Sequence, residues 1–377
     1  MFIIDILIFF IIFSLVVFVH EFGHFLGARL TNVKVEEFGI GFPPKIWKKK
    51  IKETEYFIGA LPFGGYTKIY GMDDIDDEKD KDPHGYEKQG PWAKALICLG
   101  GVIMNIIFAA FIFYFLIASS GFKMSQVMIL EDYKFPFGEQ VNYPLIIEVD
   151  ENSPAALAGL KSRDVIMKIN GEEVKSLEQF SKTIETLRGK SAVLTIIDGQ
   201  TQIFKEVTLV PRIEEVEGEG PVGIGLTEMA YISYKTWPDK IFCGFEHAYN
   251  YMDFSVRALG SMIAESVREK NIQPLADSMS GPVGIFAVTK VVSREGIVAL
   301  INFVALLSVA LGISNLLPIP AMDGAKAIFV FLEAINKKIF NKNLLAQLEK
   351  YGILFLIILA IAMVFKDFFQ FKDIILK

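Results

Sequence analysis

Four long stretches of the chain are almost wholly apolar, and their lengths predict where the chain crosses a membrane. They are residues 1–19, 95–122, 296–322 and 351–365, and the single charge among them is Asp5. A helix of about 20 apolar residues spans the core of a bilayer, and lysines that flank a shorter stretch can extend their side chains into the headgroups. The pattern therefore predicts four transmembrane helices, with the lipid bilayer as the first partner of the chain.

Shorter segments with the periodicity of strands and helices lie between the second and third apolar stretches. Strands are expected over residues 145–149, 165–169, 192–197 and 202–210, and helices over residues 153–160 and from Ser176 onward. This pattern is typical of a half-open barrel of short strands with two helices. A helix with one wide apolar face is expected after Trp237, and it would lie on a membrane or a neighbouring domain rather than cross the bilayer.

The fold class that follows is an α-helical polytopic membrane protein with about four transmembrane helices, a membrane-associated β-hairpin loop and an inserted α+β domain. The loop is residues 56–70, which alternate like a strand and turn at Gly64 and Gly65. Four parts are expected: an N-terminal membrane part at 1–122, the inserted domain at 123–228, the amphipathic helix and connector at 229–290, and a C-terminal membrane part at 291–377.

Basic residues predict the orientation of these parts. Twelve lysines and arginines lie between Arg29 and Lys94, and five lie between Lys326 and Lys350. Because loops rich in lysine and arginine stay in the cytoplasm, both loops are expected there, and both termini and residues 123–295 on the opposite side.

Composition and charge exclude several classes of protein. The chain is 52% hydrophobic and 22% charged, which is too apolar for a soluble or disordered protein. A net charge of −6 gives no basic surface for nucleic acid, so no nucleic-acid partner is expected. Two cysteines, Cys98 and Cys243, are too few for a disulfide framework.

The residues with the strongest chemical signal follow the first apolar stretch. His20, Glu21 and His24 form the pattern HExxH. Residues four apart share one face of a helix, so both imidazoles can bind one metal ion while Glu21 projects towards a water molecule. Such polar groups at the end of an apolar span are costly unless they are paired, bound to metal or in contact with water. The alternative is a polar helix end in the headgroup region.

A catalytic zinc ion usually takes three protein ligands, and Asp323 is the best candidate for the third. It ends the stretch NLLPIPAMD, in which Pro318 and Pro320 must break the third span and expose backbone groups and Asn315. Asp323 would then reach the same side of the membrane as the HExxH pattern. A helix-capping role for Asp323 is the alternative, whereas His84 and His247 are weak candidates as ligands.

With these residues the sequence resembles the site-2 protease family of intramembrane zinc metalloproteases, in its bacterial regulator of sigma-E protease branch. The resemblance rests on HEFGH, on FGGYTK at residues 63–68, on Asn105 after two glycines, on GPVG at residues 281–284 and on NLLPIPAMDG. It implies that the inserted domain is a single PDZ-like domain. It also implies Zn²⁺ as the cofactor, His20, His24 and Asp323 as its ligands, and Glu21 as the general base.

The same resemblance implies a function. The expected activity is that of a zinc-dependent intramembrane endopeptidase, which cleaves membrane proteins with a single transmembrane helix, such as pre-cleaved anti-sigma factors and remnants of signal peptides. The expected location is the bacterial inner membrane, with the PDZ-like domain and both termini periplasmic and the zinc site near the cytoplasmic side. Four residues are candidates for contact with the substrate or the oxyanion: Asn315, Asn105, Gly64 and Gly65.

Two other functions stay open at this point. A different HExxH membrane metalloprotease would take its third ligand from a downstream Glu on a helix rather than from a proline-broken segment. A non-enzymatic PDZ membrane scaffold would be unaffected by Glu21→Gln, which abolishes turnover in a protease.

Overall fold

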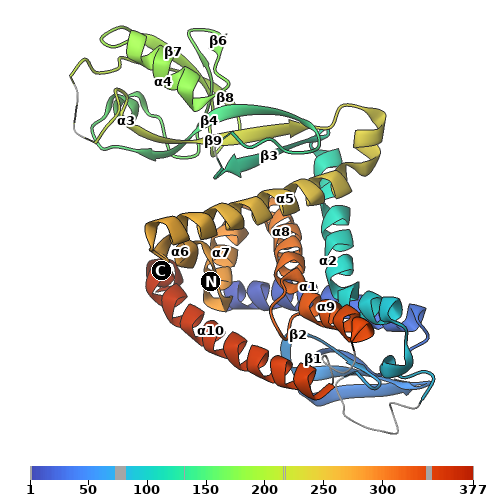
Figure 1. Ribbon diagram of the computed structural model, residues 1–377. Helices are drawn as coiled ribbons and strands as arrows, with labels where there is room; N and C mark the ends of the chain where they lie inside the picture. Colours follow the sequence, from blue (N-terminus) through green and yellow to red (C-terminus); the bar gives the residue numbers. More distant parts are fainter. Residues whose placement is uncertain are drawn as a thin grey trace. The chain divides into compact units, whose positions relative to one another are not determined.

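The computed structural model describes residues 2–72, 82–130, 132–214, 216, 218–336 and 342–376, and the chain divides into two compact units. The first unit combines residues 1–116 with 244–377, and the second consists of residues 117–243. Figure 1 labels the helices and strands of both units.

Four helices in the described part of the chain are long and apolar enough to cross a membrane. They are α1 (Phe2–Leu30), α2 (Pro91–Ser119), α8 (Ile297–Leu316) and α10 (Lys342–Leu376). Each contains one of the predicted apolar stretches or most of it, and α1 continues through the HExxH pattern. Large apolar side chains on their surfaces, such as Ile11 and Phe365, are exposed to the surroundings, as expected of helices that face lipid.

Further helices complete the first unit. They are the 3-10 helix η2 (Tyr86–Lys88), the amphipathic helix α5 (Trp237–Glu269), and α6 (Gln273–Ser278), α7 (Pro282–Arg294) and α9 (Asp323–Ile335). The last residues of α2 and the first residues of α5 belong to the second unit. The GPVG stretch starts α7, and the carboxylate of Asp367 on α10 accepts hydrogen bonds from the amides of Gly281 at 2.8 Å and Gly284 at 2.7 Å. This buried carboxylate satisfies donors that a helix leaves unpaired at its N-terminus.

Helices α1 and α2 approach each other closely because glycines face each other where they cross. A methyl group on Gly23 would lie 2.1 Å from the carbonyl oxygen of Gly100, and one on Gly27 would lie 3.1 Å from the Cα of Ile97. Small residues allow such backbone contact between apolar helices, where side-chain burial gives little driving force. The crossing sets the distance between the HExxH pattern and the middle of α2.

A curled antiparallel hairpin packs against α1. It consists of β1 (Val35–Ile51) and β2 (Thr54–Ile69). Residues 55–58 of β2 pair with two segments of β1, 37–40 and 47–50, whereas residues 65–68 pair in the described register only with 37–40. Residues 65–68 therefore form an edge of the sheet. The predicted turn at Gly64 and Gly65 lies inside β2, because the residues before and after it, 55–58 and 65–68, both pair with residues 37–40 of β1, a strand that was not predicted.

The second unit is an α+β domain. Its sheet has the order β3-β9-β4-β5-β7-β8, with β6 paired to β5. The strands are β3 (Lys123–Met128), β4 (Glu139–Val149), β5 (Val165–Ile169), β6 (Glu172–Glu173), β7 (Ala192–Ile197), β8 (Phe204–Leu209) and β9 (Ile224–Ser233), and the helices are α3 (Pro154–Ala158) and α4 (Leu177–Thr186).

The core of this domain matches the predicted pattern of strands and helices. Phe180 and Ile184 of α4 are buried against apolar residues of β5, β7 and β8, such as Leu194. The side chain of Ser176 caps α4, as the sequence predicted, by accepting a hydrogen bond from the amide of Gln179 at 3.1 Å. The outer strands β3 and β9 were not predicted, and β9 runs across the expected boundary at residue 228.

Candidate metal centre

Two histidine rings project from one face of α1 into the interior of the first unit. His20 and His24 are one helical turn apart, and their rings meet edge to face with centroids 4.8 Å apart. Their Nε2 atoms are 3.2 Å apart, and the residues are 6% and 9% exposed. The HExxH spacing therefore places two nitrogen ligands side by side at the end of an apolar helix.

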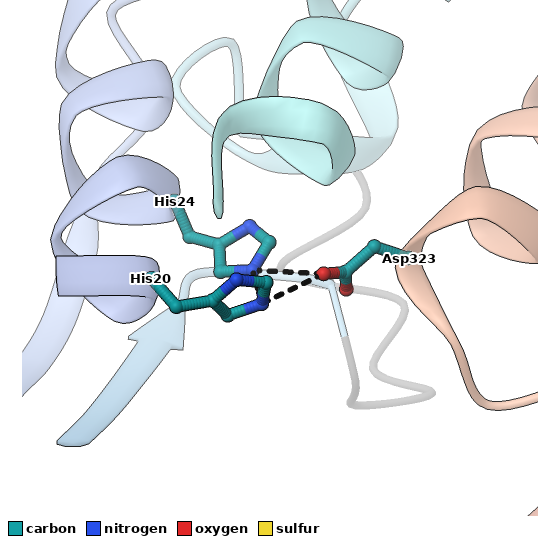
Figure 2. A group of neighbouring side chains, drawn as sticks. All are labelled: His20, His24 and Asp323. Atoms are coloured by element: carbon teal, nitrogen blue, oxygen red, sulfur yellow. Dashed lines mark hydrogen bonds and ion pairs between the residues drawn. The ribbon is translucent and has the colours of Figure 1, made fainter. Parts of the chain in front are cut away.

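A carboxylate from another part of the chain completes the cluster. Helix α8 ends at Leu316 because Pro318 and Pro320 cannot donate the hydrogen bonds of a helix. Ala321 then adopts a left-handed conformation with φ of 79°, and α9 begins at Asp323. Figure 2 shows the carboxylate of Asp323 pointing at both histidines. The predicted break in the third span is present.

The three side chains converge on one small volume. Oδ2 of Asp323 is 2.9 Å from Nε2 of His20 and 3.3 Å from Nε2 of His24. All three candidate ligand atoms lie within 4.8 Å of one another. Met322 rather than Asp323 occupies the N-cap position of α9, and it makes no side-chain hydrogen bond there. The geometry thus favours a ligand role for Asp323 over a capping role.

The hydrogen bonding of His24 shows that this cluster suits a cation. The Nδ1 atom of His24 is 2.8 Å from the carbonyl oxygen of Ile97, and a carbonyl can only accept. In neutral His24 the proton is therefore on Nδ1, so a lone pair on Nε2 faces the carboxylate of Asp323. Two acceptors in a buried site repel each other unless a cation lies between them. Two imidazoles and one carboxylate are a usual ligand set for catalytic zinc.

Glu21 is a residue of α1, and its side chain lies against the edge of the hairpin. A methyl group on Gly65 would lie 3.0 Å from Cγ of Glu21 and 3.0 Å from Cα of Phe18, so only glycine fits without a shift. The hydroxyl of Thr67 donates a hydrogen bond to the backbone carbonyl of Glu21 at 3.0 Å. These contacts bring the edge at residues 65–68 next to the candidate base.

The other candidate residues lie in different surroundings. The amide of Asn315 donates to the carbonyl of Leu311 at 3.0 Å, within its own helix, and the side chain is partly exposed. Gly64 faces Val17, and its amide donates to the hydroxyl of Ser14 at 3.3 Å.

Asn105 lies behind the ring of His20, on the side opposite the cluster. Its Nδ2 atom is 3.3 Å from Nδ1 of His20. Gly101 lies beside both rings, where a methyl group would be 2.6 Å from Nε2 of His24 and 2.6 Å from Cε1 of His20. The roles of the Ile97 carbonyl and Gly101 were not predicted. A backbone carbonyl leaves no signal in a sequence, whereas the pair Gly100-Gly101 was visible.

The two remaining histidines lie apart from this cluster. His84 is exposed, and its Nδ1 atom is 3.1 Å from the carbonyl of Asn32. His247 on α5 is 3% exposed and packs edge to face on Phe113, and burial lowers the pKa of its imidazole to about 4. Neither imidazole belongs to the group formed by His20, His24 and Asp323.

An HExxH helix joined by a carboxylate from a broken helix as the candidate third ligand, among apolar helices, is the arrangement expected of a membrane metalloprotease. The chain belongs to peptidase family M50, whose family model matches residues 8–359. It is therefore an intramembrane zinc metalloprotease, as its resemblance to site-2 proteases implied.

Relatives along most of the chain agree with this assignment. A Clostridium acetobutylicum protein named “putative zinc metalloprotease” is 32% identical, and the match covers 94% of each chain. A chloroplastic membrane metalloprotease of Arabidopsis thaliana is 30% identical, over 93% of this chain and 76% of the relative.

Proposed function

We propose that the protein hydrolyses peptide bonds within or near the transmembrane segments of membrane proteins that have a single transmembrane helix. The observation that carries this proposal is the convergence of His20, His24 and Asp323 beside Glu21, at the end of a helix apolar enough to span a membrane. His20, His24 and Asp323 hold the zinc ion, which polarises water and the scissile carbonyl when bound.

Glu21 acts as the general base in this proposal. It follows His20 directly, so it lies at the same end of α1 as both histidines, and its stem is held against Gly65. The carboxylate accepts a proton from the attacking water and then returns it to the leaving amine.

The edge of the hairpin binds the substrate in an extended conformation. A transmembrane helix hides its carbonyls in its own hydrogen bonds, so the scissile segment must unwind before water can attack. Residues 65–68 offer a strand edge next to Glu21, and an extended peptide can add to such an edge through main-chain hydrogen bonds. Gly65 begins this edge and acts through its backbone, whereas the amide of the neighbouring Gly64 donates to the hydroxyl of Ser14. Ile58 pairs on both sides and offers no such edge.

Glu21→Gln tests the catalytic proposal. This change keeps the shape of the side chain and removes the base, so zinc content should stay at wild-type level while cleavage of a single-span substrate falls about 10²- to 10⁴-fold. His84→Gln is the matched control, because His84 is exposed and away from the cluster, and it should cleave normally. Wild-type turnover by Glu21→Gln would refute the role of the base and favour a scaffold.

N-methylated substrates test the binding of an extended strand. Methylation of one backbone nitrogen removes one hydrogen-bond donor and leaves the side chain unchanged. Because successive N–H groups along a strand point to opposite edges, cleavage should drop at every second methylated position. Equal tolerance at all positions near the scissile bond would contradict pairing with residues 65–68.

The α+β domain is PDZ-like and restricts entry to substrates that another protease has already trimmed. Its ends allow a direct test, because the amide of Tyr234 donates to the carbonyl of Phe122 at 2.9 Å. Residues 123–233 can therefore be excised and Phe122 joined to Tyr234. The shortened protein should cleave both trimmed and untrimmed substrates, whereas the full chain cleaves only the trimmed form. Continued discrimination by the shortened protein would place the filter elsewhere.

The same proposal includes the location and orientation of the protein. The protein lies in the bacterial inner membrane with its termini and the PDZ-like domain in the periplasm and the zinc site near the cytoplasmic side. The distribution of lysine and arginine supports this orientation. A reporter enzyme fused after residue 377 should be active if it is one that functions only in the periplasm, and inactive if it is one that functions only in the cytoplasm.

A further inference from the structure

Asn105 is a fully buried amide in contact with a ligand histidine, and it makes an incomplete set of hydrogen bonds. It lies on α2 with 0% exposure, and its Nδ2 atom is 3.3 Å from Nδ1 of His20. Its Oδ1 atom has no hydrogen-bond partner among the described residues. The hydroxyl of Ser308 on α8 donates to the backbone carbonyl of Asn105 at 2.9 Å, which ties this position to a second helix.

The proton on His20 decides which amide atom of Asn105 can face it. A neutral imidazole carries one proton, and a ring nitrogen that binds metal carries none. If Nε2 of His20 binds zinc, its proton must be on Nδ1. That N–H can donate only to an acceptor, so the carbonyl oxygen of Asn105 must face the ring. The amide nitrogen faces it instead when the proton is on Nε2 and points at Asp323.

Each histidine therefore has one hydrogen-bond partner at its Nδ1 atom, but the two partners differ in chemical kind. His24 donates from Nδ1 to the carbonyl of Ile97, which cannot donate in return. His20 has an amide that offers either a donor or an acceptor after a half turn about its last bond, because its oxygen and nitrogen occupy nearly the same volume. In the orientation described, Oδ1 has no hydrogen-bond partner among the described residues, so the turn breaks no hydrogen bond of Oδ1.

We propose that Asn105 is a positioning residue that holds His20 for zinc binding by accepting a hydrogen bond from Nδ1–H through Oδ1. This inference rests on the proposed zinc site. Asn105 was a candidate for contact with the substrate, and this inference assigns it instead the role of holding a zinc ligand in place. Partners of this kind fix the tautomer and the ring orientation of a metal-binding histidine, and their loss typically weakens metal binding about 10- to 100-fold.

The test compares zinc affinities of the full-length protein in detergent, measured by competition with a chromophoric chelator. Asn105→Leu removes both polar atoms while keeping the branched shape of the side chain, and it should raise the zinc dissociation constant about 10- to 100-fold. Asn105→Asp keeps the acceptor and should bind zinc at least as tightly as wild type. Asn302→Leu is the matched control. It makes the same change at an asparagine on α8 whose buried Oδ1 likewise has no partner in the part of the chain that the structure describes, and it should bind zinc like wild type.

The outcomes separate this inference from the proposed function. Wild type that binds no zinc would refute the zinc site itself. Wild-type affinity in Asn105→Leu, or a tenfold loss in Asn105→Asp, would overturn the acceptor role while leaving the zinc site in place. If Asn105→Leu fails to fold, the affinity of Asn105→Asp decides alone, because a donor role and an acceptor role predict opposite results. Thermal unfolding of the metal-free variants shows whether a loss of affinity is merely a loss of stability.

Discussion

Gly101→Ala is the smallest change that should damage the zinc site without touching a ligand. Gly101 lies on α2 directly beside both rings. A methyl group there would be 2.6 Å from Nε2 of His24, 2.6 Å from Cε1 of His20 and 2.7 Å from Nε2 of His20. The two Nε2 atoms are the ones that face Asp323, so the added methyl group presses on the proposed ligand atoms themselves.

The size of the effect follows from these distances. Carbon needs about 3.5 Å to a non-bonded neighbour, so the rings must retreat by about 0.9 Å. They cannot do so freely, because Nδ1 of His24 is held by Ile97 and that of His20 by Asn105. A displacement near 1 Å in a catalytic site costs about 10²-fold in rate, or about 2.7 kcal/mol. We expect kcat/KM to fall by about that factor and zinc affinity to fall as well.

Gly260→Ala is the control, because a methyl group on Gly260 of α5 would meet nothing within 4 Å. Both variants are assayed with one single-span substrate and one zinc competition assay. Gly260→Ala should match wild type in both. The reasoning fails if Gly101→Ala binds zinc and cleaves like wild type, since the rings could then move without cost.

Three further predictions concern other buried groups. Asp323→Ala removes one of three ligands, and metal analysis should show less than one zinc per chain; full occupancy would exclude this residue as a ligand. Asp367→Ala leaves the amides of Gly281 and Gly284 unpaired and should lower the free energy of unfolding by about 1 to 3 kcal/mol with zinc affinity unchanged; equal melting temperatures would contradict this. Burial lowers the pKa of His247 to about 4. The unfolded chain therefore binds more protons at this residue between about pH 6.5 and 4, and stability should fall by about 3 kcal/mol as the pH drops through that range. Melting curves of His247→Gln should show a weaker pH dependence.

The parts of the site carried by local patterns could be predicted from the sequence. HExxH fixes His20 and His24 on one face of a helix by spacing alone. Pro318 and Pro320 end α8 whatever contacts the helix makes elsewhere, because proline has no backbone N–H to donate. The position of Asp323 after a break was therefore also predictable. The structure brings all three together.

Features that depend on distant contacts could not be predicted in the same way. Strand β1 has no regular alternation, and it contains Pro43 and Pro44 as well as a run of lysines. It becomes a strand through its pairing with β2. The predicted break was expected to expose Asn315, but its side-chain amide donates a hydrogen bond to the carbonyl of Leu311 in the same helix. The choice between such a bond and a substrate contact depends on three-dimensional placement, which spacing does not determine.

Helix α2 supports the proposed zinc site although it supplies none of the proposed ligands. Ile97, Gly101 and Asn105 recur every four residues, so they lie along one face of α2. Ile97 meets His24, Asn105 meets His20, and Gly101 lies between the two rings. The helices are therefore antiparallel with matched four-residue spacings. Because the backbone contact of Gly23 with Gly100 holds this register, α1 and α2 fix two ligands together. The third ligand must come from a segment that can adjust to them, and a broken helix is such a segment.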